Sequence, residues 1–551
     1  MKRILSLILA CVMIVLVFSA CNNTTNSEVT TAPDTTVTEK ATEEATEETT
    51  EAASTVETTE ETTLVSTVDS TAATTEDTSL DESTETSAEA TSEETSEETS
   101  AEETSKETSE ETSAEETSEE TSVEETSEEA SEETSEETSI EETTPEETTT
   151  EAESLYEIEG LDLDGSKLQS AMVDMLGSGN MMNETVFLFE TDLDGEPKSL
   201  LFPIAEIVSV TNYACNRTYT EGVDYEVVDG KLKILTTTLT SRAAIKMSKY
   251  YGTSDSMLQT YKPDGTLSNT LWGENTPMTY QLCVTYKYTT DWEGFEQKSN
   301  IQTYENVVKK LIAGEDVTFI FYGDSITCGA NASWFTGAQP GQYSYPMLFT
   351  EAVADLFGYT VNYVNVSHLH SLIKPVPEDY VAGTRGTINF INSAVGGWNT
   401  KDGLNNFDTF VKPYIQEYGC DLLVLAYGMN DGGTSVSSVM NSTKSMIDKA
   451  SALSSDLHVA IVSTMVPNNL APGWYKNQDK QEAEFIILAE ELAASGVKVA
   501  VTQMTSMSLS ILDYKAFVDY TGNNINHPND FFGKVYAQTL FQSFIGYEYL
   551  K

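Results

Sequence analysis

Residues 317–327 read Val-Thr-Phe-Ile-Phe-Tyr-Gly-Asp-Ser-Ile-Thr, a mostly apolar run followed by a short polar turn. Runs of this kind are typical of strands buried on both faces of a parallel sheet. Four more follow, at residues 388–391, 421–426, 457–466 and 497–501. Between them lie stretches with helical character, at residues 345–357, 436–453 and 481–494. This alternation predicts a doubly wound, flavodoxin-like α/β domain over residues 301–551, with its active site beyond the carboxyl ends of the strands.

Short polar blocks follow several of the predicted strands. Ser325 directly follows the first strand, near the start of a helix, where backbone N–H groups point outward. Three further blocks follow in chain order, namely Asn392–Gly397, Gly428–Asp431 and His527-Pro528. Together the four blocks resemble those of the SGNH (GDSL-type) hydrolases, and the resemblance covers residues 318–549. The resemblance implies a serine hydrolase domain in this part of the chain.

The resemblance also implies a role for each block. Ser325 corresponds to the nucleophile and His527 to its base, since a serine hydroxyl attacks poorly unless a nearby imidazole accepts its proton. Attack on an ester places negative charge on the former carbonyl oxygen. The N–H groups of Ser325 and Gly397 and the side-chain amide of Asn430 correspond to the donors of the oxyanion hole, each worth about 3–4 kcal/mol.

The chain has only four histidines. His458 begins a predicted core strand, where a structural role is expected. His368 and His370 lie in a predicted loop and could line the site or be exposed. His527 precedes the last predicted helix, at the position of the family's catalytic histidine, and is the preferred base.

One position departs from the family pattern. The family's acid lies three residues before the histidine, where this chain has Asn524. An amide can orient the imidazole, but it cannot supply the charge that stabilises imidazolium. Three outcomes are open: a Ser325–His527 dyad whose ring is oriented by a carbonyl, replacement of the acid by Asp530 or Asp519, or reduced or lost activity. The dyad is the preferred hypothesis, and Asp530 is the second.

Other residues near these blocks have structural interpretations. Asp324 and Asp431 are expected to brace their turns through hydrogen bonds to the backbone. Trp398 could wall an acyl or sugar pocket or could cap the core, and both interpretations stay open. The sequence shows no glycine-rich phosphate loop and no clustered metal ligands, so we expect neither a cofactor nor a metal.

Residues 155–300 predict a β-rich, sandwich-like domain that precedes the hydrolase domain. Asp229-Gly230 separates two short strand-like stretches and indicates a two-residue hairpin with a type I′ turn. Residues 279–288 alternate as a half-buried strand does. Trp272 and Trp292 could stack on sugar rings, although core packing is the preferred interpretation. The function of this domain is open.

The composition changes sharply before residue 154. Residues 22–153 are almost wholly Thr, Ser, Glu and Ala, and they hold 45 acidic residues against two lysines in a chain of net charge −61. Such a segment cannot bury enough apolar surface to fold, so it predicts a disordered, extended tether. Residues 1–21 resemble a bacterial lipoprotein signal, in which Cys21 would carry the lipid. We therefore expect export to the cell surface, with membrane attachment only through Cys21, or secretion.

These features together predict an extracellular serine esterase. The preferred substrate is an acetyl or other short-chain O-ester on a polysaccharide or oligosaccharide, a choice that rests on the family and the location. Two alternatives stay open: a surface-displayed carbohydrate-binding protein on a degenerate hydrolase scaffold, and a hydrolase of lipid esters or thioesters. An acidic chain without a basic patch argues against a nucleic-acid partner.

Overall fold

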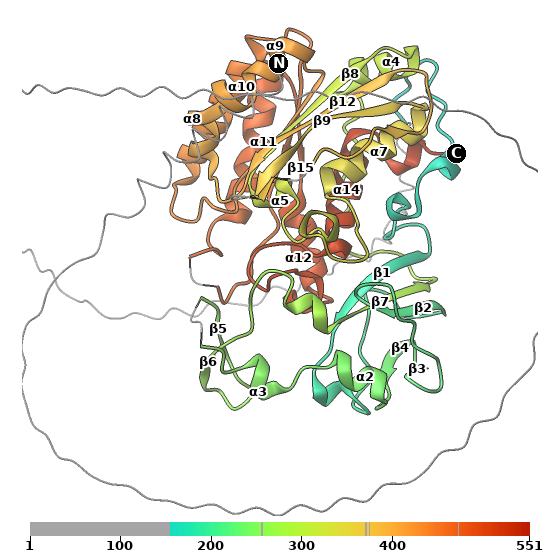
Figure 1. Cartoon of the computed structure of the whole chain (residues 1–551). Coiled ribbons are helices and arrows are strands. Elements are labelled where there is room, and N and C mark those ends of the chain that lie inside the picture. The colour runs from blue at the N-terminus through green and yellow to red at the C-terminus, as the bar shows by residue number, and fades with distance from the viewer. Residues whose placement is uncertain (1–154, 255–256, 370–371, 374, 472) are drawn as a thin grey trace, which may run out of the picture. The chain divides into compact units, whose positions relative to one another are not determined.

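The computed structural model describes residues 155–551 except 255–256, 370–371, 374 and 472 (Figure 1). The predicted signal segment, the tether and Cys21 lie outside the described residues. Within the described part of the chain, no helix combines the length and the apolar character that a membrane span needs.

An eight-stranded sheet forms the centre of the carboxyl-terminal part (Figure 1). Six of its strands run parallel in the order β9-β12-β8-β13-β14-β15, with these bounds: β8 Val317–Gly323, β9 Thr360–Leu369, β12 Thr387–Val395, β13 Leu422–Ala426, β14 His458–Val462 and β15 Lys498–Thr502. Two short antiparallel strands, β10 (Leu372–Ile373) and β11 (Tyr380–Val381), pair with β9. The order of the five strands from β12 to β15 is that of a flavodoxin-like sheet, which confirms the predicted fold class.

Helices cover both faces of this sheet, and β8 shows why. Its side chains alternate, so that Phe319 and Phe321 enter one apolar cluster while Ile320 and Tyr322 enter the other. The first cluster is closed by α7 (Tyr345–Phe357), α12 (Met504–Leu512) and α14 (Asp530–Phe544), and the second by α8 (Thr400–Phe410), α10 (Val436–Ser451) and α11 (Gln478–Ala494). The shorter helices of this part include α4 (Glu305–Ala313), α6 (Ser333–Thr336) and α9 (Lys412–Tyr418).

The strand β9 has no counterpart among the predicted strands, and its last residues, 367–369, extend into the loop that was expected between Val366 and Thr387. Its sequence alternates polar and apolar residues, with Val361 and Tyr363 buried and Thr360 and Asn362 only partly so. A strand near the sheet edge needs only one fully apolar face, so a search for continuous apolar runs misses it. His368 therefore belongs to a strand, and His370 lies outside the described residues.

The β-rich part contains three antiparallel sheets. The largest has the order β1-β7-β2, with β1 at Asn180–Phe187, β2 at Glu206–Asn212 and β7 at Gln281–Lys287. The pairs β3 (Tyr225–Val228) with β4 (Lys231–Ile234) and β5 (Gln259–Tyr261) with β6 (Leu267–Asn269) form the others, beside the short helices α2 (Thr238–Ala243) and α3 (Met247–Tyr250). Positive φ angles at Asp229 and Gly230, 50° and 72°, confirm the type I′ hairpin.

A buried ion pair joins the β-rich part to the α/β part. Glu184 of β1 accepts hydrogen bonds from the Lys515 ammonium at 2.6 Å, the Tyr286 hydroxyl at 2.7 Å and the Leu201 N–H at 3.0 Å. The Glu184 and Lys515 side chains are 0% and 1% exposed. Lys515 lies just before the short helix α13 (Phe517–Tyr520), which leads to the loop that carries His527. The β-rich part therefore contacts the α/β part close to the predicted site.

Candidate active site

The strand–turn–helix around Ser325 fixes the position of its hydroxyl. The strand β8 ends at Gly323, and Ser325 begins the short helix α5 (Ser325–Cys328). Asp324 caps this helix, since its Oδ1 accepts the Ile326 N–H at 3.0 Å, and this confirms the expected bracing of the turn. A Cβ at Gly323 would lie 2.4 Å from the carbonyl oxygen of Ala426, so the turn requires glycine there. Burial raises the pKa of Asp324 to about 7.

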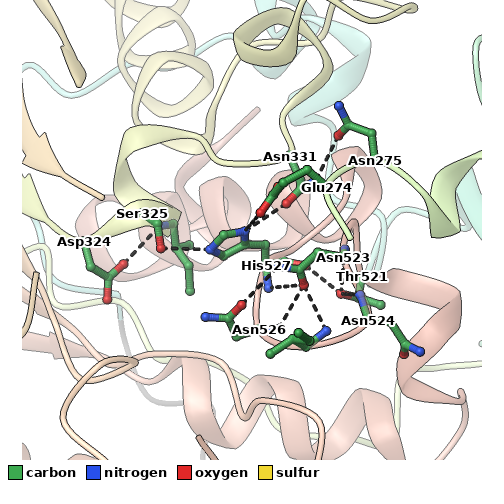
Figure 2. Close-up of polar contacts among 12 residues, drawn as sticks. Glu274, Asn275, Asp324, Ser325, Asn331, Thr521, Asn523, Asn524, Asn526 and His527 are labelled. Carbon is green, nitrogen blue, oxygen red and sulfur yellow. Dashed lines mark hydrogen bonds and ion pairs between the residues drawn. The ribbon is translucent and has the colours of Figure 1, made fainter. Parts of the chain in front are cut away.

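The loop that carries His527 is held by its own polar side chains. Asn523 Oδ1 accepts the N–H groups of Ile525, Asn526 and His527 at 2.9–3.1 Å. The Thr521 hydroxyl donates to the His527 carbonyl at 2.7 Å. These bonds close a tight turn directly before α14, so the imidazole projects from a fixed backbone (Figure 2).

The structure brings Ser325 and His527 together (Figure 2). Nε2 of His527 lies 2.9 Å from Oγ of Ser325, and the two residues are 7% and 4% exposed. Nδ1 lies 2.9 Å from Oδ1 of Asn331, whose Nδ2 in turn donates to Oδ1 of Asn275 at 2.8 Å. This second bond turns the Asn331 oxygen toward the ring. Nδ1 therefore carries the proton, and Nε2 is free to accept one from the serine, as a general base requires.

A carboxylate also approaches Nδ1, and it comes from the β-rich part. Oε1 of Glu274 lies 3.5 Å from Nδ1 of His527, and the Glu274 side chain is 56% exposed. Burial raises the pKa of Glu274, but the hydrogen bond and charge of His527, together with hydrogen bonds from Asn331 and Asn523, outweigh burial and hold this pKa below its usual value. The sequence analysis identified neither Glu274 nor Asn331. Glu274 lies about 250 residues before the histidine, in a segment without a recognisable motif, so no local signal pointed to it.

The expectation that Asn524 or Asp530 could orient the histidine is not met. Asn524 has φ 64°, and its amide donates to the Leu271 carbonyl at 2.9 Å and to the Tyr250 hydroxyl at 3.2 Å. Oδ1 of Asp530 accepts the Ser333 N–H at 2.9 Å, and burial raises the pKa of Asp530 to about 6.

The carboxylate of Asp519 also binds backbone groups away from the imidazole. Its Oδ1 accepts the Phe187 N–H at 2.7 Å, and its Oδ2 accepts the Ala516 N–H at 3.1 Å. None of the three candidates contacts the imidazole, because each binds a neighbouring element instead. The ring is oriented by Asn331 and Glu274.

The expected oxyanion donors follow three neighbouring strands. Ser325 follows β8, Gly397 follows β12 and Asn430 follows β13, and parallel strands end at the same sheet edge. Gly397 is exposed, with φ 82° and open space where a Cβ would stand, so an approaching ester meets no side chain there. Asn430 Nδ2 donates one hydrogen to the Trp398 carbonyl at 2.9 Å, which leaves its second N–H for a substrate oxygen.

We expect Asn430→Ala to lower kcat by about 10²–10³-fold with little change in KM, the usual effect of removing one oxyanion donor. Steady-state kinetics with p-nitrophenyl acetate measure both constants. An unchanged kcat would mean that Asn430 only anchors the Trp398 carbonyl.

Several neighbouring residues have structural roles in the described part. Asp431 accepts the hydroxyl and N–H of Thr400 at 2.7 and 3.1 Å, so its carboxylate joins the Gly428–Asp431 turn to the start of α8. The Trp398 ring packs edge-on against Phe410 at a centroid distance of 4.9 Å, beside the second apolar cluster. His458 is 1% exposed at the start of β14, and burial lowers its pKa.

The two tryptophans of the β-rich part contact the core. Trp272 packs against buried Leu258 and Ile525. Trp292 packs against the first apolar cluster and donates its N–H to the Phe295 carbonyl at 2.9 Å, and it also lines a cavity of about 260 Å³. Within the described residues, no group of three or more His, Cys, Asp or Glu side chains could hold a metal ion.

Comparison with known proteins gives a family match for part of the chain. Residues 319–516 match the family model described as GDSL-like lipase/acylhydrolase. A search of curated proteins found no match.

Three similar solved structures are esterases or members of the lipolytic G-D-S-L family. A two-domain esterase active on acetylated mannans is 16% identical, with a TM-score of 0.32, over 44% of this chain and 53% of that one. The chain thus matches about half the length of that esterase. A lipolytic G-D-S-L protein from Veillonella parvula is 14% identical over 41% and 98% of the two chains, with a TM-score of 0.29. An acetyl-xylooligosaccharide esterase from Geobacillus is 16% identical over 43% and 96%, with a TM-score of 0.30.

Proposed function

We propose that the protein, whose residues 319–516 match the GDSL-like lipase/acylhydrolase family model, is a serine esterase with Ser325 as nucleophile and His527 as general base. The observation that carries the proposal is the 2.9 Å contact between Oγ of Ser325 and Nε2 of His527, made while Nδ1 is held by an acceptor. A hydroxyl so placed can lose its proton to the ring as it attacks an acyl carbon.

The reaction then has two halves. Oγ of Ser325 bonds to the acyl carbon while its proton passes to Nε2, and the carbonyl electrons move onto the oxygen that faces the Ser325, Gly397 and Asn430 donors. Collapse of this intermediate breaks the ester bond, and His527 returns the proton to the departing alkoxide. A water molecule attacks the acyl-serine in the second half, again losing a proton to His527. The bond between the acyl carbon and Oγ then breaks, His527 returns the proton to Oγ of Ser325, and the carboxylic acid leaves.

The substrate class in this proposal is a short-chain, acetyl-type O-ester of an extracellular carbohydrate. Ser325 is only 4% exposed, and a small acyl group is the one that reaches a buried hydroxyl most easily. The proposed location outside the cell, reached through the signal segment and anchored at Cys21 or secreted, supports a polysaccharide or oligosaccharide as the alcohol part.

The acyl-length dependence tests this assignment. With p-nitrophenyl esters, kcat/KM is expected to be highest for acetate and to fall by about tenfold or more for butyrate and again for octanoate. Acetate release from acetylated xylan and acetylated mannan, measured for the purified protein and Ser325→Ala, then identifies the sugar. A preference for octanoate would contradict the short-chain assignment and favour a lipid-ester hydrolase.

A further inference from the structure

We propose that Glu274 of the β-rich part supplies the negative charge that the family's missing aspartate would have supplied to His527. The inference rests on the proposed esterase function. In this arrangement Asn331 orients the imidazole and Glu274 stabilises the imidazolium formed during attack. The β-rich part is then a component of the active site and more than a neighbouring module.

The loop that carries Glu274 is attached to the loop that carries His527 (Figure 2). The Gly273 N–H donates to the Asn523 carbonyl at 3.2 Å, and the Leu271 carbonyl accepts the Asn524 amide at 2.9 Å. Asn524 thus stands at the sequence position of the family's acid, but its side chain binds the segment that carries Glu274.

Buried hydrogen bonds also join strands β1 and β7 of the β-rich part to the segment around His527. Gln281 of β7 donates to the carbonyls of Val518 and Thr521 at 2.7 and 3.0 Å. Asn529, which follows the histidine loop, donates to Gln281 at 3.0 Å and to the Thr185 hydroxyl of β1 at 2.9 Å. These residues are buried, so the bonds are shielded from water. Together with the loop contacts, these bonds fix the position of the Glu274 segment relative to the His527 loop.

The two partners of Nδ1 differ in what they can do. Asn331 is fully buried, and Gly522 lets it approach, because a Cβ at Gly522 would lie 2.4 Å from the Asn331 Cβ. Asn331 is neutral, so it selects the tautomer without favouring the charged ring. Glu274 is ionised, since its pKa is held below its usual value, and its Oε1 lies 3.5 Å from the ring nitrogen. An opposite charge at that distance favours imidazolium.

Two other carboxyl groups lie within three residues of Ser325 or His527 in the chain. Asp324 lies at the base of the Ser325 turn, bound to the Ile326 N–H, and Asp530 begins α14, bound to the Ser333 N–H. Both are buried, and neither contacts the imidazole. A variant of Glu274 leaves both in place, so a change in the pH profile between variant and unaltered protein reports on Glu274.

The test is the pH dependence of kcat for p-nitrophenyl acetate in Glu274→Gln, which keeps the shape of the side chain and removes its charge. Because the side chain is half-exposed and its charge is screened, we expect kcat to fall by about 10- to 100-fold, less than for a buried triad carboxylate. KM should stay the same, and the acid limb of the profile should move to lower pH. Glu274→Asp, which keeps the charge, should retain more of kcat and a limb near that of the unaltered protein.

Glu293→Gln is the matched control, because Glu293 is another exposed carboxylate of the β-rich part, and it should change neither kcat nor the limb. Full kcat and an unmoved limb in Glu274→Gln would overturn the inference while the esterase function stands. A loss of kcat accompanied by a lower Tm and an unmoved limb would overturn it too, since that result indicates packing rather than charge. Hydrolysis no faster in the unaltered protein than in Ser325→Ala would overturn the inference and the proposed function together.

Discussion

Ser325→Ala is expected to lower kcat for p-nitrophenyl acetate by about 10⁴-fold or more, because removing the nucleophile removes the covalent route. The side chain is small and the turn is held by Asp324 rather than by the serine hydroxyl, so the fold should persist with an unchanged Tm. His527→Asn should cause a loss of similar size. The double variant should be no slower than either single one, because nucleophile and base act as a unit.

Ser437→Ala provides the matched control, since Ser437 is exposed in the first turn of α10 and lies outside the proposed site. Its kcat should equal that of the unaltered protein. If Ser325→Ala retained the full rate, the ester hydrolysis would have to occur elsewhere, and the interpretation of the chain as a binding protein on a hydrolase scaffold would gain support.

Lys515→Met should be the most destabilising of these substitutions, by about 3–5 kcal/mol, because it leaves the carboxylate of Glu184 buried without its cation. The Tyr286 hydroxyl and the Leu201 N–H would stay bound to Glu184, but neither carries a charge. Urea denaturation followed by fluorescence measures the free energy of unfolding. Since the pair joins the β-rich part to the segment before α13, activity should also be lost at a lower urea concentration.

Lys246→Met serves as the comparison, since its partner Glu190 is 3.8 Å away and the Lys246 side chain is 71% exposed. A surface pair of this kind contributes about 0–1 kcal/mol. Equal stabilities for Lys515→Met and Lys246→Met would show that the buried pair contributes nothing to the attachment of the two parts. The double variant Lys515→Met with Glu184→Gln should recover part of the loss, because no uncompensated charge remains.

The sheet could be predicted from the sequence wherever a strand is buried on both faces. The run Val317–Tyr322 is apolar because β8 lies between two helical layers, and the same holds for β13 and β14. The strand β9 was missed because it lies near the edge of the sheet and alternates along its length. In the β-rich part, the Asp229-Gly230 turn signal predicted the β3–β4 hairpin, and the alternation of residues 279–288 predicted β7.

The site could be predicted only as far as short motifs reach. Ser325 and His527 each lie beside local signals, a strand end and a helix start, and the structure places them together. The partner of the histidine could not be found in this way. Glu274 belongs to the β-rich part of the chain, far from His527 in the sequence. Asn331 follows α5 and has a positive φ of 65°, a backbone conformation that the sequence does not announce. Only the folded structure therefore reveals either residue.

Covalent labelling with a fluorophosphonate tests the central claim most directly, because the reagent is attacked by an activated serine and stays attached. Peptide mapping by mass spectrometry should find a single adduct on the peptide that contains Ser325. It should find no adduct in Ser325→Ala and a much slower one in His527→Asn. An unlabelled protein, or an adduct that persists in Ser325→Ala, would contradict the account.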